Sequence, residues 1–104
     1  MLDATFASLA DPTRRAIVER LTREREVAVG DIAAPFAASL PAIIKHIDVL
    51  EGAGLVVRER RGRRVCCRLA TDPMKEARAW LDQNLAFWTA SFDRLDTLLD
   101  EDER

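Results

Sequence analysis

The sequence predicts a mainly α-helical fold with one small β-hairpin, an α+β arrangement that ends in a long helix. Three observations predict it. Apolar residues recur at the helical spacing of three to four over most of the chain. Two β-rich runs flank an arginine-rich turn around Gly62. A last apolar stripe, over about 73–100, has the steps of one continuous helix.

Length and composition predict a single domain over residues 1–104. Hydrophobic residues make up 48% of the chain and charged residues 33%, as in ordinary soluble proteins. No stretch has the length of a membrane span or the pattern of a signal peptide, so no membrane partner is expected. The two cysteines are adjacent and cannot form a disulfide framework, which favours a cytoplasmic location. The net charge of −2 excludes a uniformly basic coat for nucleic acid, although a local basic patch is compatible with it.

The chain opens with two expected helices. Leu2 to Leu9 is short and mostly apolar, and we expect Phe6 and Leu9 to face inward. Asp11 and Pro12 then form a strong helix start, with aspartate as the N-cap and proline at the first helical position.

A helix-turn-helix is predicted over about 29–53. Its first helix is expected from Val29 to Phe36, and Ser39 is the expected N-cap of a second helix over Leu40 to Glu51. Gly54 suits a left-handed helix end. The face of the second helix that docks on the core is expected to carry Ile43, Ile47 and Leu50.

A hairpin over about 55–69 displays most of the positive charge. Six arginines and one glutamate lie between residues 58 and 68, with Gly62 at the turn. Clustered arginines are the electrostatic signature of phosphate contacts. The alternative is a hairpin whose arginines are merely hydrated.

The last helix is expected over about 73–100 and to be about 40 Å long. Its apolar residues follow at heptad-like steps, and the small body cannot cover so long a stripe. A second copy of the chain would cover it and form a two-fold homodimer. The alternative is a helix folded back on its own domain. The candidate interface residues are Leu81, Leu85, Trp88, Phe92 and Leu95.

This order of elements is that of a winged helix-turn-helix with a long C-terminal dimerisation helix. Such a domain binds rather than catalyses, and the chain has no glycine-rich phosphate loop and only one histidine, so we expect neither an enzyme nor a cofactor. A dimer would place two recognition helices about 34 Å apart, which predicts a near-palindromic double-stranded DNA operator.

Several segments resemble the ArsR/SmtB family of bacterial transcriptional repressors. They are Leu9 to Ile17 (LADPTRRAI), Val29 to Ala33 (VGDIA), Ser39 to Ile47 (SLPAIIKHI) and Val49 to Leu55 (VLEGAGL). The first of these and the tryptophan-containing last helix look like the branch often encoded beside START-like (activator of Hsp90 ATPase-like) proteins.

The resemblance implies a recognition helix over Leu40 to Gly52. His46 has a second interpretation, because a lone helical histidine is often a packed or capping residue. Two positions depart from the family pattern: Ile44 replaces a common serine, and Asp48 replaces a common lysine or arginine, so both are expected to weaken phosphate attraction. The implied DNA-facing residues are Ser39, Leu40, Ala42, Lys45, His46, Arg61, Arg63 and Arg64.

The family's familiar metal sites lack their ligands here. Ala28-Val29-Gly30 stands where the arsenic-type Cys-Val-Cys box would fall, and the last helix has no histidine for the zinc-type site. No metal is therefore expected. Adjacent strand residues point to opposite faces, so of Cys66 and Cys67 one should face the core. The other is an inert residue, a thiol sensor or a soft-metal ligand.

The sequence thus predicts a dimeric, sequence-specific DNA-binding regulator that acts as a repressor. Two alternatives stay open. One is a winged-helix protein-interaction module with weak or lost DNA binding. The other is a repressor that responds to thiol reagents or trivalent arsenic through Cys66 or Cys67.

Overall fold

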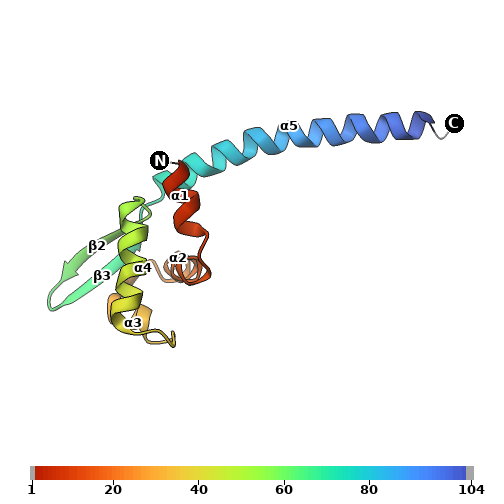
Figure 1. Cartoon of the computed structure of the whole chain (residues 1–104). Helices are drawn as coiled ribbons and strands as arrows, with labels where there is room; N and C mark the ends of the chain where they lie inside the picture. The colour runs from red at the N-terminus through yellow and green to blue at the C-terminus, as the bar shows by residue number, and fades with distance from the viewer. Residues whose placement is uncertain (1, 103–104) are drawn as a thin grey trace.

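The computed structural model describes residues 2–102, and side chains to residue 100. Five helices and three strands follow one another in the order expected of a helix-turn-helix with a wing (Figure 1). They are α1 (Leu2–Leu9), α2 (Pro12–Glu24), β1 (Glu26–Ala28), α3 (Val29–Ala33), α4 (Leu40–Gly52), β2 (Val56–Arg61), β3 (Arg64–Leu69) and α5 (Asp72–Asp102).

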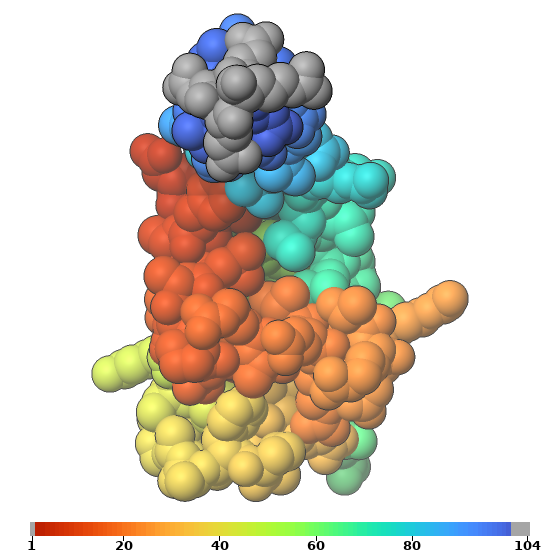
Figure 2. Space-filling model, turned by 90° about the vertical axis from the view of Figure 1, so that its right-hand side faces the viewer, coloured from red at the N-terminus to blue at the C-terminus, as the bar shows by residue number. Residues whose placement is uncertain are grey.

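The body of the molecule consists of α1 to α4 and one antiparallel sheet of three strands in the order β1-β3-β2. The β2–β3 hairpin projects to one side of α4, and α5 leaves the body as a nearly straight rod (Figure 1). Viewed along that rod, the body lies below it (Figure 2). The longest dimension of the molecule is therefore 71 Å, against 27 and 22 Å for the other two.

One apolar core holds α2, α3, α4 and the sheet together. The expected docking face of α4 is correct, because Ile43, Ile47 and Leu50 are fully buried. Burial of each such side chain stabilises the fold by about 1.5–3 kcal/mol. The other members of the core are Ile17, Val18, Leu21, Val27, Ile32, Ala53, Leu55, Val56 and Cys67.

Polar caps fix where the helices begin and end. The Asp11 carboxylate accepts a hydrogen bond from the Thr13 amide, and Ser39 Oγ accepts one from the Ala42 amide at 3.3 Å. Both residues were expected as N-caps. After α4, Gly54 has a φ of +77°, the left-handed conformation that glycine adopts without strain.

Two local features differ from the sequence prediction. The strand β1 was not expected, because three residues are too short to give a periodic signal. The helix expected to reach Phe36 ends at Ala33. The cause is Pro35, which has no amide hydrogen to donate to the Asp31 carbonyl. That carbonyl accepts a hydrogen bond from the Arg20 side chain instead.

The first helix also faces differently from the expectation. Thr5 and Ser8 are its buried residues, and Leu9 packs at the edge of the core. The buried Ser8 hydroxyl donates a hydrogen bond to the Thr5 carbonyl at 2.8 Å. The inward position expected for Phe6 is wrong: its ring is 38% exposed and meets the edge of Trp80 on α5 at a centroid distance of 5.7 Å.

Beyond this contact α5 is bare. Its side chains from Trp80 to Asp100 are exposed, apart from the half-buried Ser91. Across residues 2–102, no helix is long and apolar enough to cross a membrane.

Candidate nucleic-acid interface

The N-terminal half of α4 presents a surface to solvent. Ser39, Leu40 and Lys45 are exposed, whereas Ala42 and His46 are half-buried beside them. The Lys45 ammonium has no ion-pair partner among residues 2–100, so it is available to an anion. All five were expected to face DNA, and they lie on this end of one helix. Their contact with DNA stays a prediction.

His46 lies against α2. Its Nδ1 atom is 3.3 Å from a terminal nitrogen of Arg14, which also donates to the carbonyls of Ala7 and Ser8. A guanidinium can only donate, so Nδ1 accepts and the ring proton of the neutral form sits on Nε2. Arg14 thus links α1 and α2 to α4, a role that the sequence did not indicate.

Asp48 is not a free negative charge on α4. A terminal nitrogen of Arg58 on β2 lies 2.6 Å from its carboxylate, and the same guanidinium binds both oxygens of Glu51 at 2.9 Å. The bond from Arg58 lowers the pKa of the Glu51 carboxyl, and the two carboxylates raise the pKa of Arg58. We call these three residues the Arg58 clasp. It links α4 to the wing, so the repulsion expected from Asp48 is locally compensated.

Most wing arginines are also paired with acids. Arg64 binds the Asp31 carboxylate on α3 at 2.7 Å. Arg61 binds Glu59 at 2.8 Å and Glu26 at 3.3 Å. A fourth arginine, Arg68, binds Glu59 at 2.9 Å and lowers the pKa of that carboxyl. The cluster that looked strongly basic along the sequence is therefore largely neutralised across the sheet.

Two arginines at the tip of the wing keep their charge unpaired within residues 2–100. Arg63 is exposed beside Gly62, whose φ of +65° makes the tight turn. Arg60 is also exposed, and its Nε donates only to the Gly62 carbonyl at 3.2 Å. Arg63 was among the expected DNA contacts and Arg60 was not. The missed signal is position: Arg63 lies in the turn itself, and Arg60 lies on the face of β2 opposite to the paired residues Glu59 and Arg61.

The two cysteines alternate as expected for a strand. Cys67 is fully buried in the core, and burial raises the pKa of its thiol to about 11. Cys66 is half-buried on the outer face, where its register partners are Glu59 on β2 and Ala28 on β1. At neutral pH the folded protein therefore keeps Cys67 as a buried thiol, which leaves Cys66 as the candidate sensor.

The structure also bears on the other expected sites. Within the described part of the chain, no group of three or more His, Cys, Asp or Glu side chains is placed to hold a metal ion. The five candidate interface residues on α5 are 49–65% exposed. The ring centroids of Trp88 and Phe92 lie 6.0 Å apart, and those of Phe87 and Trp88 lie 5.8 Å apart. This helix face has no partner within the described chain.

Comparison with known proteins agrees with the geometry. A family model described as a helix-turn-helix domain matches residues 9–59. The HTH-type transcriptional regulator Rv2034 of Mycobacterium tuberculosis is 37% identical over 96% of this chain and 90% of its own length. The transcriptional repressor SdpR of Bacillus subtilis is 30% identical over 77% of this chain and 88% of its own.

Solved structures give the same result. The ArsR family transcriptional regulator RHA00566 superposes with a TM-score of 0.78 at 38% identity, covering 85% of this chain and 90% of that one. A homodimeric winged helix-turn-helix DNA-binding domain, Mb0332 from Mycobacterium bovis, superposes with a TM-score of 0.64 at 27% identity, covering 81% and 76%.

The fold, the exposed N-terminal half of α4 and the wing define a winged helix-turn-helix protein. More specifically, the chain belongs to the ArsR/SmtB family of DNA-binding transcriptional regulators, which are not enzymes.

Proposed function

We propose that the protein is a cytoplasmic, homodimeric repressor that binds a near-palindromic DNA operator and works without the family's familiar metal sites. The observation that carries the proposal is the pairing of an exposed helix end, Ser39 to His46, with a wing whose tip keeps Arg60 and Arg63 unpaired. The helix end has the size and polarity to read bases in the major groove. The wing tip has the charge to bind phosphates.

The repressor role is supported by two relatives, SdpR and the SmtB protein of Mycobacterium tuberculosis, both described as transcriptional repressors. The dimer is supported by the homodimeric neighbour from Mycobacterium bovis and by the bare apolar face of α5. In a dimer built on that face, two copies of α4 would read two half-sites.

The proposal also accounts for the acids on the interface. A protein-interaction module that had lost DNA binding would have no need to neutralise Asp48 and Glu51. The Arg58 clasp does so at the side of α4 that faces the wing. This favours DNA binding over the interaction module.

The test is binding to double-stranded DNA from upstream of the protein's own gene. We expect saturable binding that weakens steeply with salt, and a much lower affinity for a scrambled duplex of the same composition. Transcription in vitro from that promoter should fall as the site fills. Equal affinity for both duplexes would contradict sequence-specific binding, and unchanged transcription at saturation would contradict repression.

A further inference from the structure

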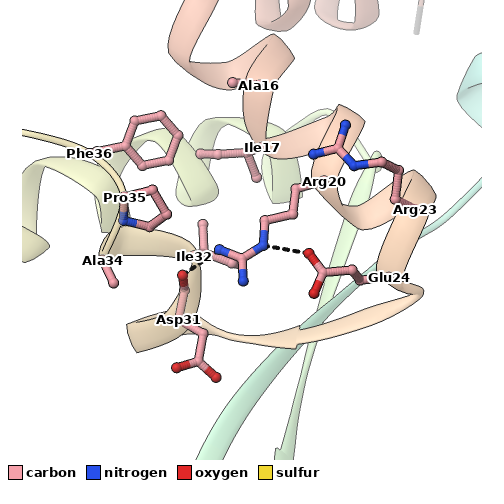
Figure 3. Close-up of a pocket in the computed structure, with 10 residues that line it drawn as sticks. All are labelled: Ala16, Ile17, Arg20, Arg23, Glu24, Asp31, Ile32, Ala34, Pro35 and Phe36. Carbon is pink, nitrogen blue, oxygen red and sulfur yellow. Dashed lines mark hydrogen bonds and ion pairs between the residues drawn. The ribbon is translucent and has the colours of Figure 1, made fainter.

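An open pocket of about 600 Å³ lies between α2, α3 and the segment that follows α3 (Figure 3). Pro35 and Phe36 form one wall, and Arg20 and Arg23 on α2 form the opposite wall. Ile17 and Ile32 lie between the two walls. Its volume falls within the range of small-molecule sites, and it lies outside the surface proposed for DNA.

The charges in this pocket do not cancel. Arg20 donates to Glu24 Oε2 at 2.7 Å and to the Asp31 carbonyl, which holds its guanidinium against the pocket. The negative charge of Glu24 is therefore compensated by Arg20. The Asp31 carboxylate points out of the pocket and pairs with Arg64. Arg23 has no ion pair among residues 2–100, so the pocket carries one uncompensated positive charge.

We infer that this pocket binds a small aromatic monocarboxylate. The carboxylate would lie between the two guanidinium groups, where charge-assisted hydrogen bonds are strongest. The ring would pack on Phe36 and Pro35 over the floor made by Ile17 and Ile32. A neutral ligand of the same shape would leave the Arg23 charge unpaired.

The position of Asp31 gives such a ligand a route to the DNA-binding surface. Its carbonyl contacts Arg20 in the pocket wall, and its carboxylate holds Arg64, the residue of β3 next to the turn of the wing. A ligand that draws Arg20 towards itself therefore acts on the residue that fixes Arg64.

The experiment titrates the free protein with naphthylacetate and with naphthylacetamide, which has the same shape and no charge, and follows binding by ligand fluorescence. Because no DNA is present, the outcome is independent of the proposed function. We expect saturable binding of the acid and an affinity for the amide about tenfold lower. Equal affinities, or no saturable binding of the acid up to about 1 mM, would overturn the inference.

Two variants locate the site. Arg23→Gln removes the unpaired charge, and Ala34→Glu places a carboxylate at the rim; both side chains are exposed, so the fold should persist. Each should abolish the preference for the acid. Ala37→Glu is the matched control, since Ala37 is exposed on the same segment but does not line the pocket, and it should bind as the wild type does. Unchanged binding in both pocket variants would place the ligand elsewhere and overturn the inference.

Discussion

Single residues decide how the charge of this interface is distributed. Arg58 is the clearest case, because its one guanidinium is within hydrogen-bond distance of two carboxylates on α4. Exposed ion pairs contribute less than about 1 kcal/mol each to stability. The consequence of the clasp is therefore expected in DNA binding, where two uncompensated acids would repel phosphate.

Replacing Arg58 tests this directly. Arg58→Gln should lower DNA affinity several-fold while the free energy of unfolding changes by less than about 1 kcal/mol, because the acids are uncovered but the core is intact. Adding Asp48→Asn and Glu51→Gln to that variant should restore most of the affinity. Titration of labelled operator DNA at constant salt measures both. If the triple variant bound no better than the single one, Arg58 would act by contacting DNA rather than by covering the acids.

The burial of the Cys67 thiol predicts that the folded protein loses stability in alkali. Burial raises the pKa of its folded thiol from 9.0 to about 11, so the thiol binds its proton more tightly when folded. This contribution is fully present below pH 9.0 and is lost as the pH rises through about 11. Urea unfolding over this range should show the loss, and Cys67→Ala should remove that part of it. The chain has no tyrosine to titrate in the same window.

The same burial predicts thiol reactivity. A colorimetric thiol reagent should modify one cysteine per native chain, Cys66, and the second only after denaturation. Cys66→Ser should abolish the fast reaction. Two equally fast cysteines would contradict the alternation of Cys66 and Cys67 about the strand. If neither oxidant nor trivalent arsenic alters DNA binding of the wild type, Cys66 is no sensor.

At the scale of elements, the wing should position the protein rather than read bases. Arg63→Ala with Arg64→Ala should weaken binding to every sequence and reduce the salt slope by about 0.9 for each phosphate that is no longer neutralised. Lys75→Ala with Arg78→Ala removes the same charge at the base of α5 and serves as the control. A wild-type affinity of the wing variant at all salt concentrations would show that these arginines are only hydrated surface.

Lys45 on α4, in contrast to the wing, is expected to contribute to sequence preference. Lys45→Ala should weaken binding to the operator more than to the scrambled duplex, because the residue lies on the end of the helix proposed to enter the major groove. An equal loss of affinity on both duplexes would assign Lys45 to a phosphate instead.

The helix α5 should be the dimer element. Leu85→Glu places a charge in the exposed apolar stripe and should shift the chain from dimer to monomer. Ala90→Glu introduces the same charge on the opposite face of the helix and should leave the dimer intact. Sedimentation at micromolar concentration distinguishes the two variants. A dimer that survives Leu85→Glu but not Ala90→Glu would place the dimer contact on the Ala90 face of α5 and contradict the prediction.

Long periodic elements and their caps were predictable from sequence, and tertiary pairings were not. The burial of Ile43 and Ile47, the cap at Ser39 and the turn at Gly54 all follow from local chemistry. The end of α3 could have been read from Pro35. By contrast, the clasp around Arg58 joins residues seven and ten positions apart on different elements, and no local rule connects them. A count of arginines therefore overstated the positive charge of the wing.

At the scale of the whole molecule, a small body is joined to one long helix that extends away from it (Figure 1). The core holds α2, α3, α4 and the sheet as one unit, and α5 extends from it to give the 71 Å length (Figure 1). A bare apolar helix of this kind is unfavourable in water unless it is covered. A two-fold pairing would cover it and would place two recognition helices on one duplex.

The composition of the DNA complex tests this account most directly. The chain mass is 11.7 kDa, and sedimentation should give about twice that value for the free protein. With operator DNA at about 0.15 M salt, the complex should contain two chains per duplex and dissociate as salt is raised. A folded chain that stays monomeric and binds the duplex singly, or not at all, would contradict it.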